Sequence, residues 1–232
     1  MKKLKWDSDF WGIEVFHLEK SKEIKEELIS SSTYMIQSLP HVSDLKFINY
    51  LENNSFNFVE SKITLQKALT NSIYIANNKF KLLTLQDLIY HRGDFYNLFG
   101  KNSRFEFFTP AKVNEFYYTW LVNSIKGEMD DAVIGYYMGN RLAGFVSYRM
   151  GQSNLTIGLL AVFPEFQGKS VSQKLLNYVD YIALEKNIKS IQIATQGKNI
   201  HALNAYIKNG YHISSINHWY YYIKGETFDD SI

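Results

Sequence analysis

The chain of 232 residues contains no cysteine and only three prolines. The absence of cysteine excludes disulfide bonds, thiolate metal sites and a cysteine nucleophile. No apolar run approaches the roughly 20 residues that cross a bilayer, and residues 1–7 lack the apolar core of a signal peptide. With 25 basic and 23 acidic side chains and no long basic run, the charge gives no case for binding nucleic acid. We therefore expect a cytoplasmic protein with no metal, no nucleic-acid partner and no membrane insertion.

Apolar and aromatic residues, in contrast, are plentiful. They make up 46% and 16% of the chain, which supplies a large core and argues against disorder. The length is long for one small domain and short for two full ones, so we expect a compact catalytic domain with a smaller partner.

The amino-terminal part reads as a small α/β domain, residues 1–75. Its expected elements alternate between strand and helix: strand 9–19, helix 21–32, strand 33–39, helix 42–53 and strand 57–65. This order predicts a βαβαβ unit. The polar segment 70–79 is the expected boundary.

The remainder, residues 76–232, reads as a second α/β domain built on a mixed sheet. Segments 132–137 and 142–149 flank Gly139 and Asn140, which predicts a β-hairpin. The expected elements after it are a buried strand 154–162, helix 169–186, strand 190–195, helix 199–209 and a strand pair over 211–223.

A candidate anion site lies where strand 154–162 passes through a turn of small residues into the next helix. The first amides of a helix have no partner within it and lie at its positive end, which suits a diphosphate. Gly168 allows the main chain to approach a phosphate closely, and Lys169 adds charge at the rim.

A second constellation follows about thirty residues later. Asn199, Ala202 and Tyr206 are spaced i, i+3, i+7, which places them on one face of the expected helix, and Gly210 follows as its stop. One stripe would then present an amide, a small residue and a phenol.

Together, the Pro164-x-x-Gln-Gly-Lys-Ser-Val-Ser172 turn and the Asn199 to Tyr211 helix resemble the acetyl-CoA signature of the GCN5-related N-acetyltransferases (GNAT). The resemblance implies an acetyl-CoA-binding fold and direct acetyl transfer to an amine, with Tyr206 as the proton donor to the leaving thiolate. It assigns coenzyme binding to the main chain of the strand, to the turn and to the later helix: Leu160, Ala161, Val162, Phe166, Gln167, Gly168, Lys169, Ser170, Val171, Ser172 and Asn199.

The chain departs from the family pattern at two positions of the turn. Ser170 and Ser172 stand where the pattern has glycine, and glycine or alanine. A serine hydroxyl can still donate to phosphate, but a positive φ at position 170 is less favourable for serine than for glycine. Weaker coenzyme binding is one expectation.

Further motifs resemble the dTDP-fucosamine acetyltransferases of enterobacterial common antigen synthesis: residues 6–12, 103–105, 158–162, 194–196 and 218–220. This narrower resemblance implies an acceptor with the 4-amino group of a dTDP-linked 4-amino-4,6-dideoxygalactose, whose product feeds a surface polysaccharide. It makes Ser103, Arg104 and Gln196 candidate acceptor-side residues, and it suggests a homodimer. Ala205 stands where relatives often have a basic residue, so we expect one coenzyme contact to be missing.

Two other functions stay open. One is an acetyltransferase of the same fold that acts on a protein amino terminus, a polyamine or another small molecule. The other is a non-catalytic acyl-CoA-binding module, against which the retention of Asn199 and Tyr206 argues. The sequence does not single out a general base among its candidates, Glu106, Glu165, His91, His201 and His218.

Overall fold

The structure is a computed structural model that describes residues 1–20, 29–69, 78–90, 92–96, 98–99 and 103–225. The chain forms two compact units. The smaller unit comprises Met1–Ile63, Gln196–Lys198 and Ser215–Ile232, and the larger unit comprises Thr64–Thr195 and Asn199–Ser214. The domain boundary expected at residue 75 lies outside the described residues.

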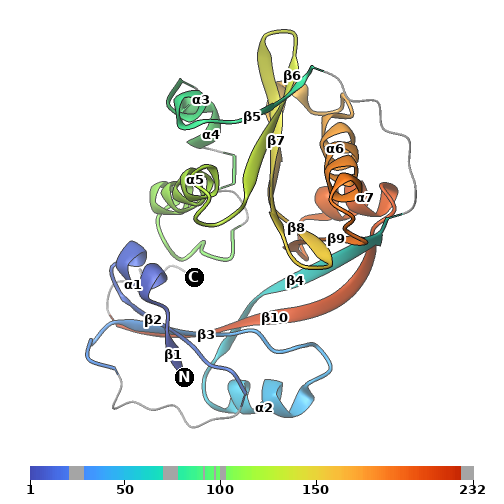
Figure 1. Ribbon diagram of the computed structural model, residues 1–232. Helices are drawn as coiled ribbons and strands as arrows, with labels where there is room; N and C mark the ends of the chain where they lie inside the picture. The colour runs from blue at the N-terminus through green and yellow to red at the C-terminus, as the bar shows by residue number, and fades with distance from the viewer. Residues whose placement is uncertain (21–28, 70–77, 91, 97, 100–102, 226–232) are drawn as a thin grey trace. The chain divides into compact units, whose positions relative to one another are not determined.

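The smaller unit is an α/β layer with the strand order β1-β2-β3-β10-β4. Strand β2 is parallel to β3, whereas the β1/β2 and β3/β10 pairs are antiparallel. Its elements (Figure 1) are β1 (Lys2–Lys3), α1 (Lys5–Trp11), β2 (Glu14–His17), β3 (Tyr34–Ser38), α2 (Leu45–Asn53) and parts of β4 (Asn57–Ala68) and β10 (His212–Lys224).

Helix α2 closes the core of this unit. Asp44 caps its amino terminus by accepting a hydrogen bond from the Phe47 N–H at 3.2 Å. Its apolar face then packs into a cluster that contains Phe16, Leu18, Tyr34, Ile36, Phe47, Ile48, Leu51, Phe56 and Tyr220. Burying this face stabilises the helix far more than its nine residues do by propensity.

Three expected elements of this part are confirmed: β3, α2 and β4. Two expectations are wrong. Residues 5–11 form helix α1 where a strand was expected to begin at residue 9, because Trp6 and Phe10 stack one helical turn apart and Gly12, at φ +74°, ends the helix. The strand pair expected over 211–223 is one continuous strand, β10. The helix expected over 21–32 falls largely on residues 21–28, which lie outside the described residues.

The larger unit has the strand order β10-β4-β9-β8-β7-β6-β5. Its sheet is mixed: β8 is parallel to β9, whereas β5/β6, β6/β7 and β7/β8 are antiparallel. Its elements are β5 (Phe80–Leu82), α3 (Leu85–Tyr90), α4 (Arg92–Tyr96), α5 (Pro110–Ile125), β6 (Ala132–Met138), β7 (Arg141–Met150), β8 (Asn154–Val162), the short 3-10 helix η2 (Pro164–Phe166), α6 (Val171–Glu185), β9 (Ser190–Gln196) and α7 (Ile200–Lys208).

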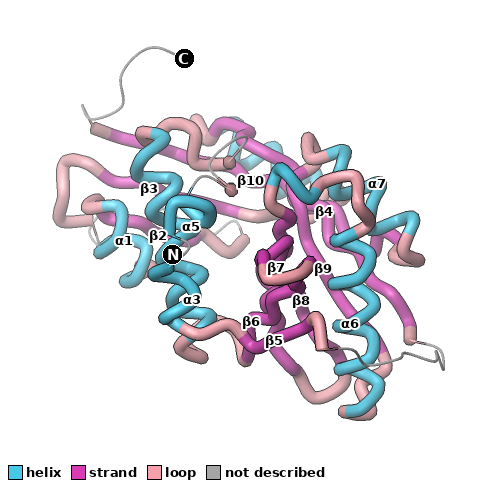
Figure 2. Tube along the Cα trace, turned by 90° about the horizontal axis from the view of Figure 1, so that it is seen from above, coloured by secondary structure: helices cyan, strands magenta, loops and turns pink. Residues whose placement is uncertain are grey.

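Helices cover both faces of this sheet. Both views place α3 and α5 on one face and α6 and α7 on the other (Figures 1 and 2). Thr109 caps α5 ahead of Pro110, a residue suited to the first turn of a helix. The expected hairpin is confirmed, with Met138 opposite Arg141 and Gly139 at φ +62°. The expected mixed α/β sheet is also confirmed.

No helix in the described part of the chain is long and apolar enough to span a membrane. Within the same described ranges, no cluster of three or more histidine, cysteine or acidic side chains is placed to hold a metal ion.

Candidate functional site

Strand β8 loses its pairing with β9 partway along its length. The parallel ladder between the two strands ends at Ile157 and Ile193, although β8 continues to Val162. Past this point β8 stays paired with β7, where Leu160 is opposite Val146 and Ala161 is opposite Phe145. The candidate strand residues Leu160, Ala161 and Val162 therefore lie where β8 is paired on its β7 side and free of the β9 ladder. Main-chain groups along such an edge can bind an extended ligand by hydrogen bonds.

The turn after β8 presents the amino terminus of α6. Gly168 has φ +73° and Ser170 has φ +57°, so both residues are left-handed. The side chain of Ser170 makes no capping hydrogen bond, and the Lys174 N–H donates to the Ser170 carbonyl at 3.2 Å as α6 begins. The amides before Lys174 have no acceptor within the helix, which makes this turn suitable for an anion.

Cationic side chains surround the same turn. The Lys169 ammonium lies 5.3 Å and the Arg141 guanidinium 4.8 Å from the centre of the Phe166 ring. Arg141 also pairs with Glu165 at 2.5 Å on the surface. Lys174 donates to the Lys169 carbonyl at 3.5 Å. Three cations against one paired carboxylate give the turn a positive character, which favours a phosphate ligand. The Gln167 amide donates to the Val162 carbonyl at 3.4 Å and so ties the turn to β8.

Asn199 lies at the start of α7 as its N-cap. Its side-chain oxygen accepts from the Ala202 N–H, and its side-chain nitrogen donates to the Thr195 hydroxyl, each at 3.2 Å. The backbone of Asn199 is not helical, with φ −84° and ψ 66°. The expected stripe of Asn199, Ala202 and Tyr206 is therefore wrong at its first residue, because Asn199 caps the helix instead of sharing its face.

Tyr206 is buried near the carboxyl end of α7. Its side chain is 6% exposed, and burial raises the pKa of its phenol. The ring lies 6.1 Å from that of Tyr211. Gly210, at φ +85°, ends the helix as expected, and the Tyr211 N–H donates back to the Tyr206 carbonyl at 3.1 Å. This closed end holds the main chain of Tyr206 in place, and burial favours the protonated phenol.

The candidate acceptor-side residues are divided between the two units. Ser103 is 1% exposed, and its hydroxyl lies 3.2 Å from the Tyr117 hydroxyl and accepts from the Phe105 N–H at 3.2 Å. The guanidinium of Arg104 lies 4.0 Å from the centre of the Phe105 ring. Ser103 and Arg104 belong to the larger unit, and Gln196 belongs to the smaller unit.

The candidate bases have varied surroundings. Glu165 pairs with Arg141, Glu106 and His201 are exposed, and His91 lies outside the described residues. The Nδ1 of His218 lies 3.1 Å from the Ser61 hydroxyl in the smaller unit.

The sequence analysis missed Glu60, which lies beside Ser61 in β4. Its carboxylate is buried, accepts from the Ser61 N–H at 2.8 Å and lies 3.5 Å from the Lys198 ammonium. Its position among the apolar residues of strand 57–65 could have indicated a buried carboxylate with polar partners, because a buried acid needs such partners. Glu60 thus holds Lys198, while the hydroxyl of its neighbour Ser61 contacts His218.

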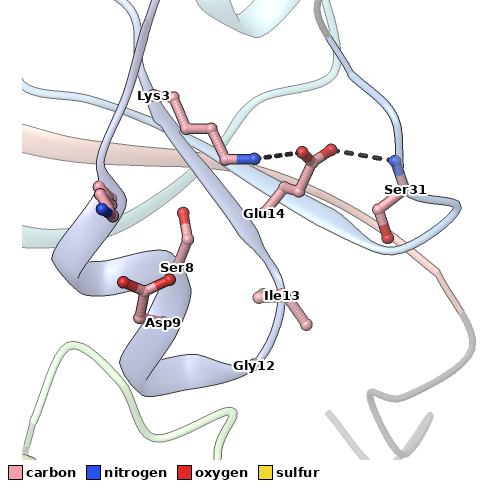
Figure 3. A pocket seen from close by; sticks show the side chains of 8 residues that line it. Lys3, Ser8, Asp9, Gly12, Ile13, Glu14 and Ser31 are labelled. Carbon is pink, nitrogen blue, oxygen red and sulfur yellow. Dashed lines mark hydrogen bonds and ion pairs between the residues drawn. The ribbon is translucent and has the colours of Figure 1, made fainter.

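The smaller unit has a pocket of about 550 Å³ lined by Lys3, Lys5, Ser8, Asp9, Gly12, Ile13, Glu14 and Ser31 (Figure 3). Its buried carboxylate, Glu14, pairs with Lys3 and accepts from the Ser30 and Ser31 N–H groups at 2.9 and 3.0 Å. The Lys3 ammonium, helped by these amides, lowers the pKa of Glu14 to about 2. Glu14 therefore anchors β1 and residues 30–31 to β2, which is a structural role.

Comparison with known proteins shows to which family the chain belongs. A family model described as the acetyltransferase (GNAT) family matches residues 94–211, just over half of the chain. The chain belongs to the acetyltransferase (GNAT) family. It is therefore an acetyl-CoA-dependent N-acetyltransferase, and the expectation drawn from the two sequence motifs is confirmed. The GNAT match includes β8, the 166–172 turn and α7.

The dTDP-fucosamine acetyltransferase of Escherichia coli O6:H1 is similar to this chain along nearly its whole length. The two are 23% identical over 224 residues, which cover 94% of this chain and 96% of the relative. Among solved structures, a GCN5-related N-acetyltransferase from Sphaerobacter thermophilus has a TM-score of 0.60 at 12% identity and covers 86% of this chain. A GNAT acetyltransferase from Colwellia psychrerythraea has a TM-score of 0.56 at 14% identity and covers 82%. The TM-scores show that the two proteins share the fold of this chain, which spans 63% and 65% of their lengths.

Proposed function

We propose that this GNAT enzyme acetylates the 4-amino group of a dTDP-linked amino-dideoxy sugar by direct transfer from acetyl-CoA. The enzyme would act in the cytoplasm, and its product would be used to make a surface polysaccharide. The observation that carries the proposal is the similarity to dTDP-fucosamine acetyltransferase, because it extends over 94% of the chain and includes the smaller unit. A coenzyme signature alone would not extend beyond the part that binds the coenzyme.

The larger unit supplies the proposed coenzyme site. The main chain of Leu160–Val162 lies along the edge where β8 is free of the β9 ladder, and it would receive the pantetheine arm. The diphosphate would bind the amides of the 166–172 turn, whose positive φ angles and surrounding cations favour an anion. Asn199 would act through its cap, which fixes the start of α7.

Transfer requires the sugar amine to lose its proton before its nitrogen attacks the thioester carbonyl carbon. The carbon–sulfur bond then breaks and leaves a thiolate. Tyr206 is the proposed donor to this sulfur. Because burial raises the pKa of Tyr206 above its usual value of about 10, and a free thiol has a pKa near 8.5, a hydrogen bond that stabilises the developing charge is favoured over complete proton transfer. The general base is left unassigned.

For the acceptor, we propose Ser103, Arg104 and Gln196 as the residues to test first. An arginine fork can bind the nucleotide diphosphate with two parallel hydrogen bonds. The buried hydroxyl of Ser103 already bonds Phe105 and contacts Tyr117, so its proposed contribution is to fix the turn that carries Arg104. We also propose that the protein is a homodimer, because its resemblance to the dTDP-fucosamine acetyltransferases suggests one.

The decisive experiment measures coenzyme A release from acetyl-CoA in the presence of dTDP-4-amino-4,6-dideoxygalactose. Turnover with this sugar, and its absence with polyamines and a peptide amino terminus, is the expected result. Turnover only with another amine would contradict the proposed acceptor and leave the enzyme class intact. Coenzyme binding without turnover on any amine would contradict catalysis and favour an acyl-CoA-binding module.

A further inference from the structure

A buried chain of hydrogen bonds connects the loop before β6 to the main chain of β8. Asp130 in that loop is 6% exposed, and its Oδ2 accepts from the Ser147 hydroxyl of β7 at 2.7 Å and from the Ser124 hydroxyl of α5 at 2.8 Å. Ser147 is fully buried, and its Oγ accepts from the Leu159 N–H of β8 at 2.8 Å. This series of hydrogen bonds therefore ends at the Leu159 N–H, directly before the proposed coenzyme edge at Leu160–Val162.

The amide of Leu159 needs this acceptor because β8 has a bulge there. Val146 is opposite Leu160, but Tyr148 is opposite Ile157. One residue of β7, Ser147, thus faces two residues of β8, Gly158 and Leu159. A bulge interrupts the ladder and leaves the extra residue without its regular pairing. The side chain of Ser147 replaces that pairing at Leu159.

Asp130 decides which way the Ser147 hydroxyl points. A hydroxyl has one proton, and the Ser147 hydroxyl donates its proton to Oδ2 of Asp130. The oxygen of Ser147 is then available as an acceptor for Leu159. Without the carboxylate, the hydroxyl proton is free to rotate toward the Leu159 N–H, which would remove the acceptor.

Gly158 allows the carboxylate to come this close. A Cβ atom at position 158 would lie 2.6 Å from Asp130 Oδ2 and 2.9 Å from Ser147 Oγ, closer than any side chain tolerates. The contact between Asp130 and Ser147 therefore requires glycine at position 158.

The bulge coincides with the place where β8 leaves β9. The β8/β9 ladder ends at Ile157, the bulge occupies 158 and 159, and the proposed coenzyme edge begins at Leu160. We propose that Asp130 and Ser147 are positioning residues for the coenzyme: they hold the bulge that directs the main chain of Leu160–Val162 away from β9. The inference rests on the proposed role of this edge in binding acetyl-CoA.

The experiment compares Ser147→Ala with Ser124→Ala as its matched control. Both remove a hydroxyl that donates to Asp130, but only Ser147 also accepts from Leu159. Two quantities are measured: hydrogen exchange at the Leu159 amide, and the dissociation constant of acetyl-CoA by calorimetry. In Ser147→Ala we expect exchange about tenfold faster and binding about tenfold weaker, because a buried amide loses its partner. In Ser124→Ala both should stay close to the parent values.

Three results would overturn the inference. Leu159 exchange could be unchanged in Ser147→Ala, or Ser124→Ala could weaken coenzyme binding as much as Ser147→Ala. The third is unfolding of both Ser147→Ala and the closer-sized Ser147→Cys, since the bond would then serve the fold as a whole. If the parent protein itself does not bind acetyl-CoA, the proposed coenzyme site fails instead, and Leu159 exchange still reports whether Ser147 holds the bulge.

Discussion

Tyr206 is buried, protonated and held at a closed helix end, which are the properties of a hydrogen-bond donor to sulfur. We predict that Tyr206→Phe lowers kcat by about a hundredfold or more and changes acetyl-CoA affinity little, because the hydroxyl acts mainly as charge develops on sulfur. Steady-state kinetics with calorimetric binding of acetyl-CoA measures both quantities.

Tyr211 provides the control for this prediction. Its ring is 6.1 Å from that of Tyr206, and its hydroxyl is buried with no hydrogen-bond partner among the residues that the structure describes. Removing an unpartnered buried hydroxyl costs little, so Tyr211→Phe should keep both kcat and stability. Parent-like turnover in Tyr206→Phe would remove Tyr206 from the mechanism, and an equal loss in both variants would indicate a packing effect.

Ser170 is left-handed at φ +57°, as the position that glycine holds in the family pattern would require. Because a side chain in this region costs about 1–2 kcal/mol, Ser170→Gly should keep or raise both stability and acetyl-CoA affinity. Urea unfolding and calorimetry test this. Ser172→Gly, which lies inside α6, is the control and should destabilise by about 0.5–1 kcal/mol. A marked loss of affinity in Ser170→Gly would show that its hydroxyl is a ligand.

At the scale of elements, periodicity predicted most of the larger unit from β6 to α7 because each element shows its own local pattern. It failed at α1, because residues 9–11 of the expected strand 9–19 form the end of a helix that stops at Gly12. The bulge of β8 was not predictable from its own sequence. Its determinants, Asp130 and Ser147, are 29 and 12 residues away from Leu159 along the chain. Asn199 stays a predicted site residue. Its role as a cap depends on α7 beginning at Ile200, one residue later than the expected start of the helix.

The close approach of β7 to β8 gives a prediction about this pair of strands. A Cβ atom at Gly144 would lie 2.6 Å from the Ala161 carbonyl oxygen and 3.2 Å from the Val162 Cα, and neither main-chain atom can yield easily. Gly144→Ala should therefore destabilise the protein by about 1–3 kcal/mol and weaken acetyl-CoA binding. Urea unfolding measures the first effect and calorimetry the second.

Gly93 in α4 is the matched control, because an added Cβ there meets no atom within 4 Å. Alanine inside a helix is favoured over glycine, so Gly93→Ala should be neutral or stabilising by up to about 1 kcal/mol. A Gly144→Ala protein as stable as Gly93→Ala would mean that the two strands separate freely at this point.

At the scale of the whole molecule, the smaller unit gathers segments that are far apart in the sequence. Tyr220 of β10 lies opposite Ser38 of β3 and donates to Glu52 of α2 at 2.7 Å. Local patterns carry no information on such pairings, because periodicity describes one element at a time. The division into domains 1–75 and 76–232 stays a prediction.

Glu14 ties the stability of the whole protein to pH on the acid side. Its pKa is about 2 in the folded protein, against an ordinary value of 4.5, because Lys3 and the amides of Ser30 and Ser31 favour the carboxylate. Between these two values the unfolded chain binds more protons than the folded one, so stability falls as pH drops from 4.5 toward 2. Above pH 4.5 the contribution is complete. We predict that Glu14→Gln is less stable than the parent at pH 6 and that the two converge at low pH.

Tryptophan fluorescence is a suitable probe, since Trp6, Trp11 and Trp219 belong to the smaller unit together with Glu14. Urea midpoints at several pH values between 2.5 and about 6 give the two curves to compare. Glu165→Gln is the control: its carboxylate is exposed and pairs with Arg141 on the surface, where ion pairs contribute little. The prediction is contradicted if the stability of Glu14→Gln has the same pH dependence as that of the parent and of Glu165→Gln. Lys3 and the amides of Ser30 and Ser31 would then not stabilise the ionised Glu14 carboxylate.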